Sequence, residues 1–133
     1  MKISIIIPCF NELNTISEVI DKIIRTVPYD YEIIVIDDYS TDGTRELLEN
    51  QLKGKITNLL LNEKNFGKGY SLKKGILNAT GDIIIVQDAD LEYDSSEFPK
   101  LIEPIMKGYA DVVYGSRFAG SEEKAVLFFW HRV

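Results

Sequence analysis

Nearly continuous runs of apolar, mostly β-branched residues recur along the chain. They occupy residues 3–7, 33–36, 83–86 and 112–114, and a weaker run occupies residues 59–61. Runs that stay apolar without alternation are typical of strands that are covered on both faces of a sheet. The pattern therefore predicts five buried strands.

Between these runs the apolar residues adopt helical spacing. An i, i+3, i+4, i+7, i+8 pattern is formed by Ile16, Val19, Ile20, Ile23 and Ile24. Further helices are predicted after an N-cap at Thr44, around Leu72 and Ile76, and from a cap at Ser95 or Ser96 to Met106. Because strands and helices alternate, the predicted fold class is α/β, with a mostly parallel, doubly wound sheet and helices on both faces.

Polar and charged residues follow four of the predicted strands. They lie at residues 8–12, at Asp37-Asp38, at residues 88–90 and at residues 115–117. In parallel α/β sheets ligands bind beyond the carboxyl ends of the strands. No such concentration is expected at the opposite strand ends, so the sequence predicts one site at the carboxyl edge.

Asp88 and Asp90 are separated by one residue directly after an apolar strand. In extended backbone, residues i and i+2 point the same way, so both carboxylates can converge on one point. Converging carboxylates repel unless a cation or a proton lies between them. A hard divalent metal suits this position, because it prefers oxygen ligands and shares them with substrate phosphates. The alternative is that Asp90 begins a loop or caps the next helix.

Composition narrows the classes of partner. The 133 residues carry a net charge of −6 without a basic run, which argues against nucleic acid and for a cation bridging the protein to a phosphate compound. The only histidine, His131, and the only cysteine, Cys9, argue against a histidine metal site and a disulfide. The chain opens directly into a short strand, so we expect neither a signal peptide nor a membrane-spanning segment, and a cytoplasmic location.

Residues from Asp38 onward satisfy the calcium-loop spacing D-x-S-x-D-G-x5-E, which ends at Glu49. The loop follows a strand rather than a helix, and Arg45 occupies the position that is usually apolar. A strand-end carboxylate is therefore the favoured interpretation. Asp38 is expected to accept hydrogen bonds from the N–H groups of a base, while Asp42-Gly43 forms a turn.

Two further basic residues have two interpretations each. Lys68 lies between Gly67 and Gly69 just before a predicted helix, where it can meet a diphosphate or belong to a solvated turn. Arg117 follows the last predicted strand. Its planar guanidinium can hold phosphate oxygens or pair with a structural carboxylate, and the neighbouring strand ends favour the ligand.

Taken together, five segments resemble a family-2 glycosyltransferase. They are IIIPCFNE (residues 5–12), VIDDYSTDGT (35–44), NFGKGYSLKKGILNATGD (65–82), QDADLEYD (87–94) and ADVVYGSRF (110–118). Within that family the chain is most similar to polyprenyl-phosphate sugar synthases, such as dolichyl-phosphate mannose or glucose synthases. The resemblance implies the nucleotide-diphospho-sugar transferase fold, called GT-A.

The resemblance also implies roles for individual residues. The positions expected to line the base and ribose are Pro8, Phe10, Glu12, Ile36 and Asp38. Asp88, Ala89 and Asp90 match the D-x-D motif, whose carboxylates hold Mg²⁺ or Mn²⁺ on the donor diphosphate. Glu92 would be a further metal contact, and Arg117 would approach the donor phosphates. Phe10 replaces the tyrosine that is usual at its position, which keeps a stacking face without the hydroxyl.

The implied reaction transfers a hexose from a UDP- or GDP-sugar to a polyprenyl phosphate, with inversion at the anomeric carbon. Other acceptors, such as a polysaccharide, stay open, and so does a non-catalytic nucleotide-binding module. A nucleotidyltransferase that makes sugar nucleotides would carry a glycine-rich loop after the first strand, and residues 8–12 do not form one. The sequence leaves both the sugar and the base open.

The resemblance implies two parts of the chain. Residues 1–118 would form the donor-binding domain, and residues 119–133 would begin a truncated acceptor-side element, so that this part alone can be inactive. The longer protein is expected to contact the cytoplasmic face of a membrane peripherally. Residues 125–130 are apolar, so we expect this tail to be poorly ordered or buried in a contact between chains, with self-association as the result.

Overall fold

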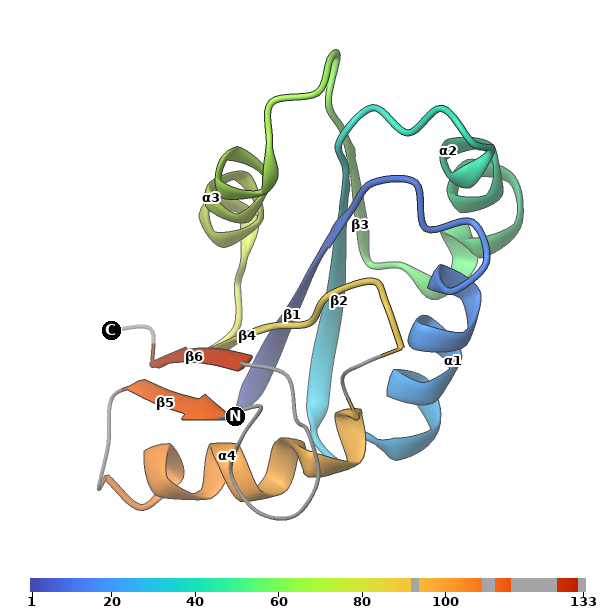
Figure 1. Cartoon of the computed structure of the whole chain (residues 1–133). Coiled ribbons are helices and arrows are strands. Elements are labelled where there is room, and N and C mark those ends of the chain that lie inside the picture. Colours follow the sequence, from blue (N-terminus) through green and yellow to red (C-terminus); the bar gives the residue numbers. More distant parts are fainter. Residues whose placement is uncertain (92–93, 109–111, 116–126, 132–133) are drawn as a thin grey trace.

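One six-stranded sheet organises the protein, in the order β3-β2-β1-β4-β6-β5 (Figure 1). The computed structural model describes residues 1–91, 94–108, 112–115 and 127–131. Four neighbouring strands are parallel: β3 (Asn58–Leu61), β2 (Asp30–Asp37), β1 (Lys2–Cys9) and β4 (Ile83–Val86). β6 (Leu127–His131) pairs antiparallel with β4 and with β5 (Val112–Gly115). The sheet is therefore mostly parallel, as predicted.

The central strand β1 sets the level at which its neighbours end. Its register with β2 runs from Lys2 opposite Asp30 to Cys9 opposite Asp37. On its other side Ile6 lies opposite Val86, the last residue of β4. Because these strands are parallel and in register, the loops that follow them emerge side by side at one edge of the sheet.

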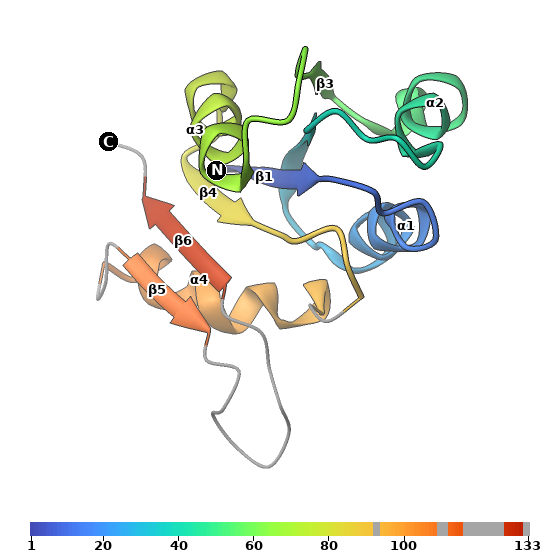
Figure 2. The same cartoon turned by 45° about the horizontal axis from the view of Figure 1, so that its top comes forward.

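Helices cover both faces of the sheet (Figures 1 and 2). One face packs against α1 (Ile16–Thr26), α4 (Phe98–Met106) and the segment formed by α2 (Thr44–Leu47) and a π-helical turn (Leu48–Leu52). Short 3-10 turns follow at Lys53–Lys55 and precede α4 at Ser95–Glu97. The other face packs against α3 (Lys68–Asn78). Within the part of the chain that the structure describes, no helix is long and apolar enough to cross a membrane.

Gly75 lets α3 lie close to the sheet. A Cβ atom at this position would come within 2.6 Å of Ile6 Cγ2 and 2.8 Å of Ile36 Cδ1. A glycine inside a helix costs about 0.5–1 kcal/mol relative to alanine. Here the close packing on two fully buried isoleucines offsets that cost and fixes the height of α3 above the sheet.

Two predicted helix starts are wrong by one or two residues. Thr44 is the first helical residue of α2, and the N-cap position belongs to Gly43, whose φ of 102° suits glycine. Asp42 supplies the capping carboxylate, because its Oδ1 accepts the Thr44 N–H at 3.0 Å. Before α4, Asp94 rather than a serine accepts the Ser96 N–H, at 3.0 Å. In both cases an aspartate that precedes the expected hydroxyl residue accepts the N-terminal N–H group.

The prediction for the apolar tail is wrong where the structure describes it. Residues 127–131 form strand β6 inside the sheet, with Trp130 opposite Ile84 of β4 and Val112 of β5. The physical reason is the free edge that β4 would otherwise present, since backbone groups of a buried strand need partners on both sides. Residues 119–126 lie outside the described part of the chain, and the proposed boundary at residue 118 stays a prediction.

Candidate functional site

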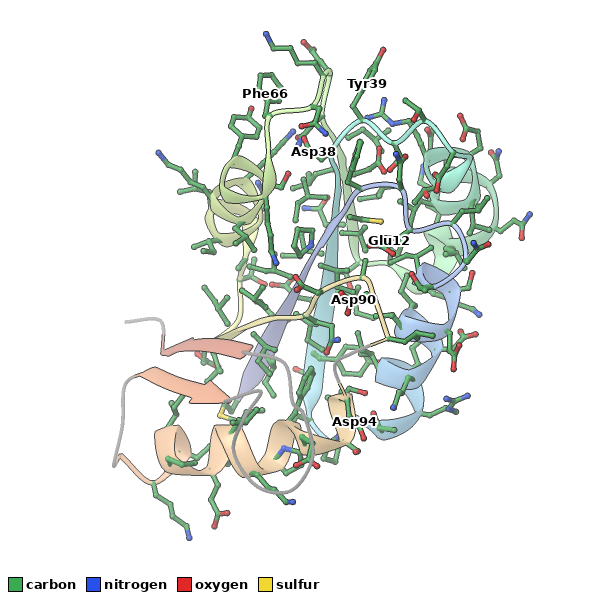
Figure 3. The ribbon with its side chains drawn as sticks, viewed as in Figure 1. Glu12, Asp38, Tyr39, Phe66, Asp90 and Asp94 are labelled. Carbon is green, nitrogen blue, oxygen red and sulfur yellow. The ribbon has the colours of Figure 1, made fainter. Side chains whose placement is uncertain are left out.

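A cavity of about 380 Å³ lies at the carboxyl ends of β1, β2 and β4, against the start of α3. Figure 3 shows Glu12, Asp38 and Asp90 on the three loops that follow these strands. The predicted site residues that line it are Pro8, Phe10, Glu12, Asp38, Lys68, Asp88, Ala89 and Asp90. The remaining lining residues are Cys9, Asn65, Gly67 and Ser71. One edge of the sheet therefore does bring the predicted residues together.

Among the described residues, the predicted site residue that does not line the cavity is Ile36. Ile36 is fully buried and packs with Ile6 and Ile34 beneath α3, so its side chain belongs to the core and not to a surface for a base. The physical reason is strand alternation, which turns the side chain of Ile36 toward the face of the sheet that α3 covers. Glu92 and Arg117 lie outside the described residues, and their roles stay predictions.

Hydrogen bonds join the loop after β1 to the loop after β2. The Asn11 N–H donates to Ser40 Oγ at 2.9 Å, and the Thr41 N–H donates to Asn11 Oδ1 at 2.8 Å. Asn11 and Tyr39 both have positive φ, 53° and 67°, a region that non-glycine residues seldom adopt. The two loops thus hold each other in a strained shape, which is a common property of binding sites.

Asp37 organises this pair of loops and does not face the cavity. Its side chain is fully buried, and its Oδ2 accepts the Ser40 N–H at 3.1 Å and the Arg45 Nε–H at 2.9 Å. Ser40 Oγ also donates to Asp37 Oδ1 at 2.6 Å. Of the two adjacent aspartates, the first is therefore a scaffold and only the second is available to a ligand.

Asp38 is already hydrogen-bonded to the loop that precedes α3. Its Oδ1 accepts the Asn62 side-chain amide at 3.0 Å and the Phe66 N–H at 2.8 Å, and its Oδ2 accepts the Gly67 N–H at 2.9 Å. A carboxylate offers about four acceptor positions. Three are occupied within the protein, so one position on Oδ2 is left for the predicted contact with a base.

Asn62 and Ser71 belong to this arrangement, and the sequence analysis missed both. Asn62 is buried, donates from Nδ2 to Asp38 Oδ1 and to Ser71 Oγ, and accepts the Lys74 ammonium at 3.0 Å. Ser71 lines the cavity from the first turn of α3. The weak sequence signal for Asn62 is an asparagine directly after a strand, at the same edge as the predicted site.

Lys68 and Asp88 form an ion pair across the cavity, with Nζ 2.6 Å from Oδ1. The carboxylate is therefore at a position that receives a cation, as the metal hypothesis requires. Among the described residues, no group of three His, Cys, Asp or Glu side chains converges on one point. Mg²⁺ and similar ions are held by one or two carboxylates plus substrate phosphates. Asp88 and Asp90 fit this donor set if a ligand supplies further oxygens.

The turn that carries these aspartates is anchored to α1. Thr15 Oγ1 lies 2.7 Å from the Ala89 carbonyl oxygen and 2.9 Å from Glu12 Oε2. Thr15 directly precedes the first residue of α1, so the loops after β1 and β4 meet at the beginning of this helix. The contact fixes Ala89, and with it the residues on either side, relative to Glu12.

Cys9 lines the cavity as a neutral thiol. Burial raises its pKa, and the negative charges of Asp37 and Glu12 raise it further. Because the thiolate is the reactive and metal-binding form, a thiol held protonated is a packing residue.

The calcium-loop spacing does not make a calcium loop. Asp38 directly follows β2 and faces the loop before α3, whereas Asp42 turns to the start of α2. Asp42 also accepts the Leu13 N–H at 3.3 Å. The two carboxylates thus serve different backbone segments, because strand and helix geometry separates them.

A polar cluster at the opposite edge of the sheet contradicts the expectation that none lies there. Glu32, near the start of β2, is 5% exposed, and its Oε1 accepts the Ser4 hydroxyl at 2.5 Å and the Thr80 N–H at 2.6 Å. Lys2 Nζ lies 3.6 Å from Oε2. Ser4 and Thr80 are isolated polar residues near apolar runs, so sequence spacing gave no reason to group them.

Comparison with known proteins identifies a matching family and several similar proteins. Residues 4–129 match Glycosyl transferase family 2. The dolichol-phosphate mannosyltransferase of Pyrococcus furiosus is 35% identical over 119 residues. The match covers 89% of this chain and 34% of that enzyme, so the chain spans about a third of its curated relative.

Two solved structures share the architecture. The mannosyltransferase PcManGT from Pyrobaculum calidifontis, in complex with GDP-Man and Mn²⁺, has a TM-score of 0.64 at 27% identity over 71% of this chain and 29% of its own. Glucosyl-3-phosphoglycerate synthase from Mycobacterium tuberculosis, with Mn²⁺, UDP-Glc and phosphoglyceric acid, also scores 0.64, at 29% identity. That match covers 80% of this chain and 40% of the synthase.

Proposed function

The chain belongs to glycosyl transferase family 2 and has the GT-A fold, and on that premise we propose that it binds the donor in a hexosyl transfer to a polyprenyl phosphate. The observation that carries the proposal is the cavity at the carboxyl strand ends, bordered by Asp88 and Asp90. The chain spans a third of its relative, so the activity proposed is that of the longer protein.

The proposed donor is a UDP- or GDP-hexose whose nucleotide lies along the cavity. Pro8, Phe10 and Glu12 would line the base and ribose, with Asp38 as one acceptor. Phe10 is 45% exposed, which leaves its ring accessible to a base that stacks on it. The diphosphate would extend toward Lys68 and the two aspartates after β4. Complexes of similar proteins with GDP-Man and with UDP-Glc support both choices of base.

Asp88 and Asp90 would hold Mg²⁺ or Mn²⁺ against the donor diphosphate. When bound, the ion supplies positive charge that neutralises the leaving nucleoside diphosphate. Mn²⁺ in the complexes of similar proteins supports this choice of cofactor. Glu92 as a further metal contact and Arg117 as a phosphate contact extend the proposal beyond the described residues.

We propose a single in-line displacement that inverts the anomeric carbon. The phosphate oxygen of a polyprenyl phosphate is already an anion, so the protein needs no strong base to activate it. Residues 1–118 would then orient the donor, and an element that starts within residues 119–133 would lead toward the acceptor. The dolichol-phosphate mannosyltransferase similarity supports a lipid phosphate as acceptor.

A peripheral contact with the cytoplasmic face of a membrane would bring that acceptor to the cavity. Its proposed surface is an aromatic–lysine face formed by Lys64 and Phe66 in the loop before α3 and by Tyr70, Lys73 and Leu77 on α3, which are all exposed. The rings of Phe66 and Tyr70 stack at 4.3 Å, and Lys64 Nζ lies 5.1 Å from the Phe66 ring. Residues 62–78 hold four lysines and one glutamate in a chain of net charge −6. Aromatic rings beside lysines suit an anionic interface.

Vesicle binding tests this surface directly. We expect the protein to cosediment with phosphatidylglycerol-containing vesicles and not with phosphatidylcholine alone. Lys64→Gln should lower the affinity about fivefold, as about 1 kcal/mol per lysine at an anionic surface implies. Lys107→Gln, at the residue that directly follows α4, is the matched control, because it removes the same charge from another exposed position. Equal effects of both substitutions would contradict a specific face.

Calorimetry with UDP and GDP, with Mn²⁺ or with EDTA, tests the donor site. We expect nucleotide affinity to fall at least tenfold when EDTA removes the metal, because the ion is shared between protein and diphosphate. Asp90→Asn should abolish most of this difference while the unfolding transition stays unchanged. Equal nucleotide affinity with and without metal would reject the metal-dependent donor site.

Acceptor assays on the longer protein separate the remaining alternatives. Transfer of radiolabelled hexose to undecaprenyl phosphate supports the proposal, whereas transfer to a water-soluble acceptor supports the second candidate. That candidate is favoured by the similarity to glucosyl-3-phosphoglycerate synthase, whose complex contains phosphoglyceric acid. Nucleotide binding without transfer to either acceptor would point to a non-catalytic nucleotide-binding module.

A further inference from the structure

We infer that Lys68 is a placeholder cation, whose ammonium group occupies Asp88 while no nucleotide is bound and thereby makes metal binding conditional on nucleotide. The inference rests on the proposed donor site and adds an order of binding to it. Its basis is the 2.6 Å contact between Lys68 Nζ and Asp88 Oδ1 inside the cavity.

The protein aims Lys68 at Asp88 through the loop that Asp38 holds. The Phe66 and Gly67 N–H groups donate to the two oxygens of Asp38, at 2.8 and 2.9 Å. Gly67 has a φ of 94°, which lets the chain turn directly into α3, and Lys68 is the first residue of that helix. The backbone of Lys68 is thus fixed, while its four-carbon side chain stays free to reorient.

The charges around the cavity explain why a cation is needed there. Of the described lining residues, Lys68 is the sole basic one, and the acidic ones are Glu12, Asp38, Asp88 and Asp90. A carboxylate that faces like charges gains from a cation nearby. In the absence of a metal, the Lys68 ammonium group supplies this positive charge to the Asp88 carboxylate. A metal ion that binds alone must therefore displace Lys68.

A nucleoside diphosphate changes this competition. Its phosphate oxygens offer the Lys68 ammonium an alternative partner within the same cavity, and Asp88 then becomes available to the metal. Nucleotide and metal would therefore each raise the affinity for the other, by the same factor, because coupling between two sites is reciprocal. The side chain of Lys68 is 58% exposed, which leaves space for the movement.

The decisive variant is Lys68→Met, which removes the ammonium and keeps an apolar stem of similar length. Calorimetric titration with Mn²⁺ alone should show affinity about three- to tenfold tighter than in the wild type, because no ion pair has to be broken. Nucleotide affinity in EDTA should fall, because the diphosphate loses a cation. The factor by which nucleotide tightens Mn²⁺ binding should shrink accordingly.

Lys64→Met is the matched control. It removes the same charge four residues away, from an exposed lysine that does not line the cavity. A similar gain in Mn²⁺ affinity in both variants would show a general effect of net charge and would overturn the inference. Lys68→Arg, which keeps a cation, should bind Mn²⁺ as weakly as the wild type does.

The outcomes also separate this inference from the proposed function. If the wild type fails to bind Mn²⁺ even with saturating nucleotide, the metal-dependent donor site is wrong, and the inference fails with it. If the wild type binds Mn²⁺ with nucleotide but Lys68→Met gains nothing without nucleotide, only the placeholder role is wrong. Far-ultraviolet circular dichroism of each variant verifies that the fold is retained.

Discussion

Strand β2 carries a buried carboxylate at each end, and the two ends behave differently. Glu32 near its start and Asp38 just after its end are both 5% exposed, and both accept backbone N–H groups from distant loops. Around Glu32 the space is filled, because a Cβ on Gly81 would meet Ser4 Oγ at 2.6 Å and Lys2 O at 2.8 Å. Asp38 instead borders a cavity of about 380 Å³.

The comparison shows that buried polar residues alone do not identify a site. The two carboxylates have similar burial and similar donors, so hydrogen bonding and exposure cannot tell them apart. The two ends differ because only Asp38 borders a described cavity, and because Asp88 and Asp90 add further acidic side chains to the border of that cavity. The Glu32 end holds three chain segments together without leaving space between them, whereas the Asp38 end holds the loop before α3 and borders a cavity that can accept a ligand.

Gly81→Val should give the largest effect, because it forces a side chain into the filled end. The nearest atoms include the backbone of Lys2 and Ser4, which cannot give way as a flexible side chain does. We expect a loss of about 3 kcal/mol or more in the free energy of unfolding, at the upper end for overpacking. Urea denaturation measures it. The folded fraction should bind nucleotide with unchanged affinity, since the cavity lies at the other end of the strand.

Gly54→Ala is the control for that substitution. A Cβ on Gly54 would have no heavy atom within 4 Å. Replacing such a glycine should leave stability unchanged or raise it by about 0.4–1 kcal/mol, because the unfolded chain loses freedom. If Gly54→Ala and Gly81→Val destabilised the protein equally, the filled character of the Glu32 end would be refuted.

Asp38→Ala should weaken nucleotide binding by about 1.5–3 kcal/mol, the range for a charge-assisted hydrogen bond. The metal dependence should remain, because Asp88 and Asp90 are untouched. The structure adds a second expected result, which is faster amide hydrogen exchange at Phe66 and Gly67, since both lose their acceptor. Normal nucleotide affinity combined with fast exchange would restrict Asp38 to its role in the loop.

Glu32→Gln tests whether the charge of Glu32 stabilises the fold, because that contribution depends on pH. Burial raises the pKa of Glu32, but hydrogen bonds from Ser4 and Thr80 outweigh it, so the net pKa lies below the ordinary value of 4.5. A lowered carboxyl pKa stabilises the fold above the unfolded-state pKa, and this stabilisation disappears as pH falls through the folded-state pKa. The variant should be about 1–2 kcal/mol less stable at pH 7, as for lost hydrogen bonds to a charged group. The difference should vanish in acid.

Urea unfolding of both proteins between pH 7 and pH 3 measures this effect. The wild type should approach the stability of Glu32→Gln as the pH falls below 4.5, the ordinary glutamate value. Nucleotide affinity at pH 7 should be the same in both proteins. A constant stability difference over the whole range would mean that the charge of Glu32 contributes nothing.

The sequence predicted the strands and the site edge because both depend on local patterns. The short, β-branched apolar runs at β1, β2 and β4 are typical of buried parallel strands, and the polar residues after them belong to the same edge by topology. The antiparallel insertion of β6 between β4 and β5 was not predictable from periodicity. Spacing describes which face of an element is buried, but not which neighbour it pairs with.

The charged residues that line the described cavity were predictable from the sequence, but their hydrogen-bond and ion-pair partners were not. Asp38 was expected to face a ligand, but its contacts with Asn62, Phe66 and Gly67 join residues that are 24 or more positions apart. Such contacts follow from tertiary packing, which composition and spacing do not encode. The ion pair between Lys68 and Asp88 was not predictable for the same reason. The sequence indicated Lys68 as a diphosphate contact or part of a solvated turn, and Asp88 only as a metal ligand.

The position of β6 has a consequence for synthesis of the protein on the ribosome. Strands β1 to β4 are complete at Val86, but the partner of the outer edge of β4 begins at Leu127. At about 5–20 residues per second, the ribosome needs about 2–8 s to add that stretch. During this interval the nascent chain has an unpaired edge of four aliphatic residues, Ile83–Val86, and such edges recruit other chains. We expect chaperone crosslinks to nascent chains that are stalled after β4 has left the exit tunnel, and we expect these crosslinks to disappear in longer stalled chains from which β6 has also emerged.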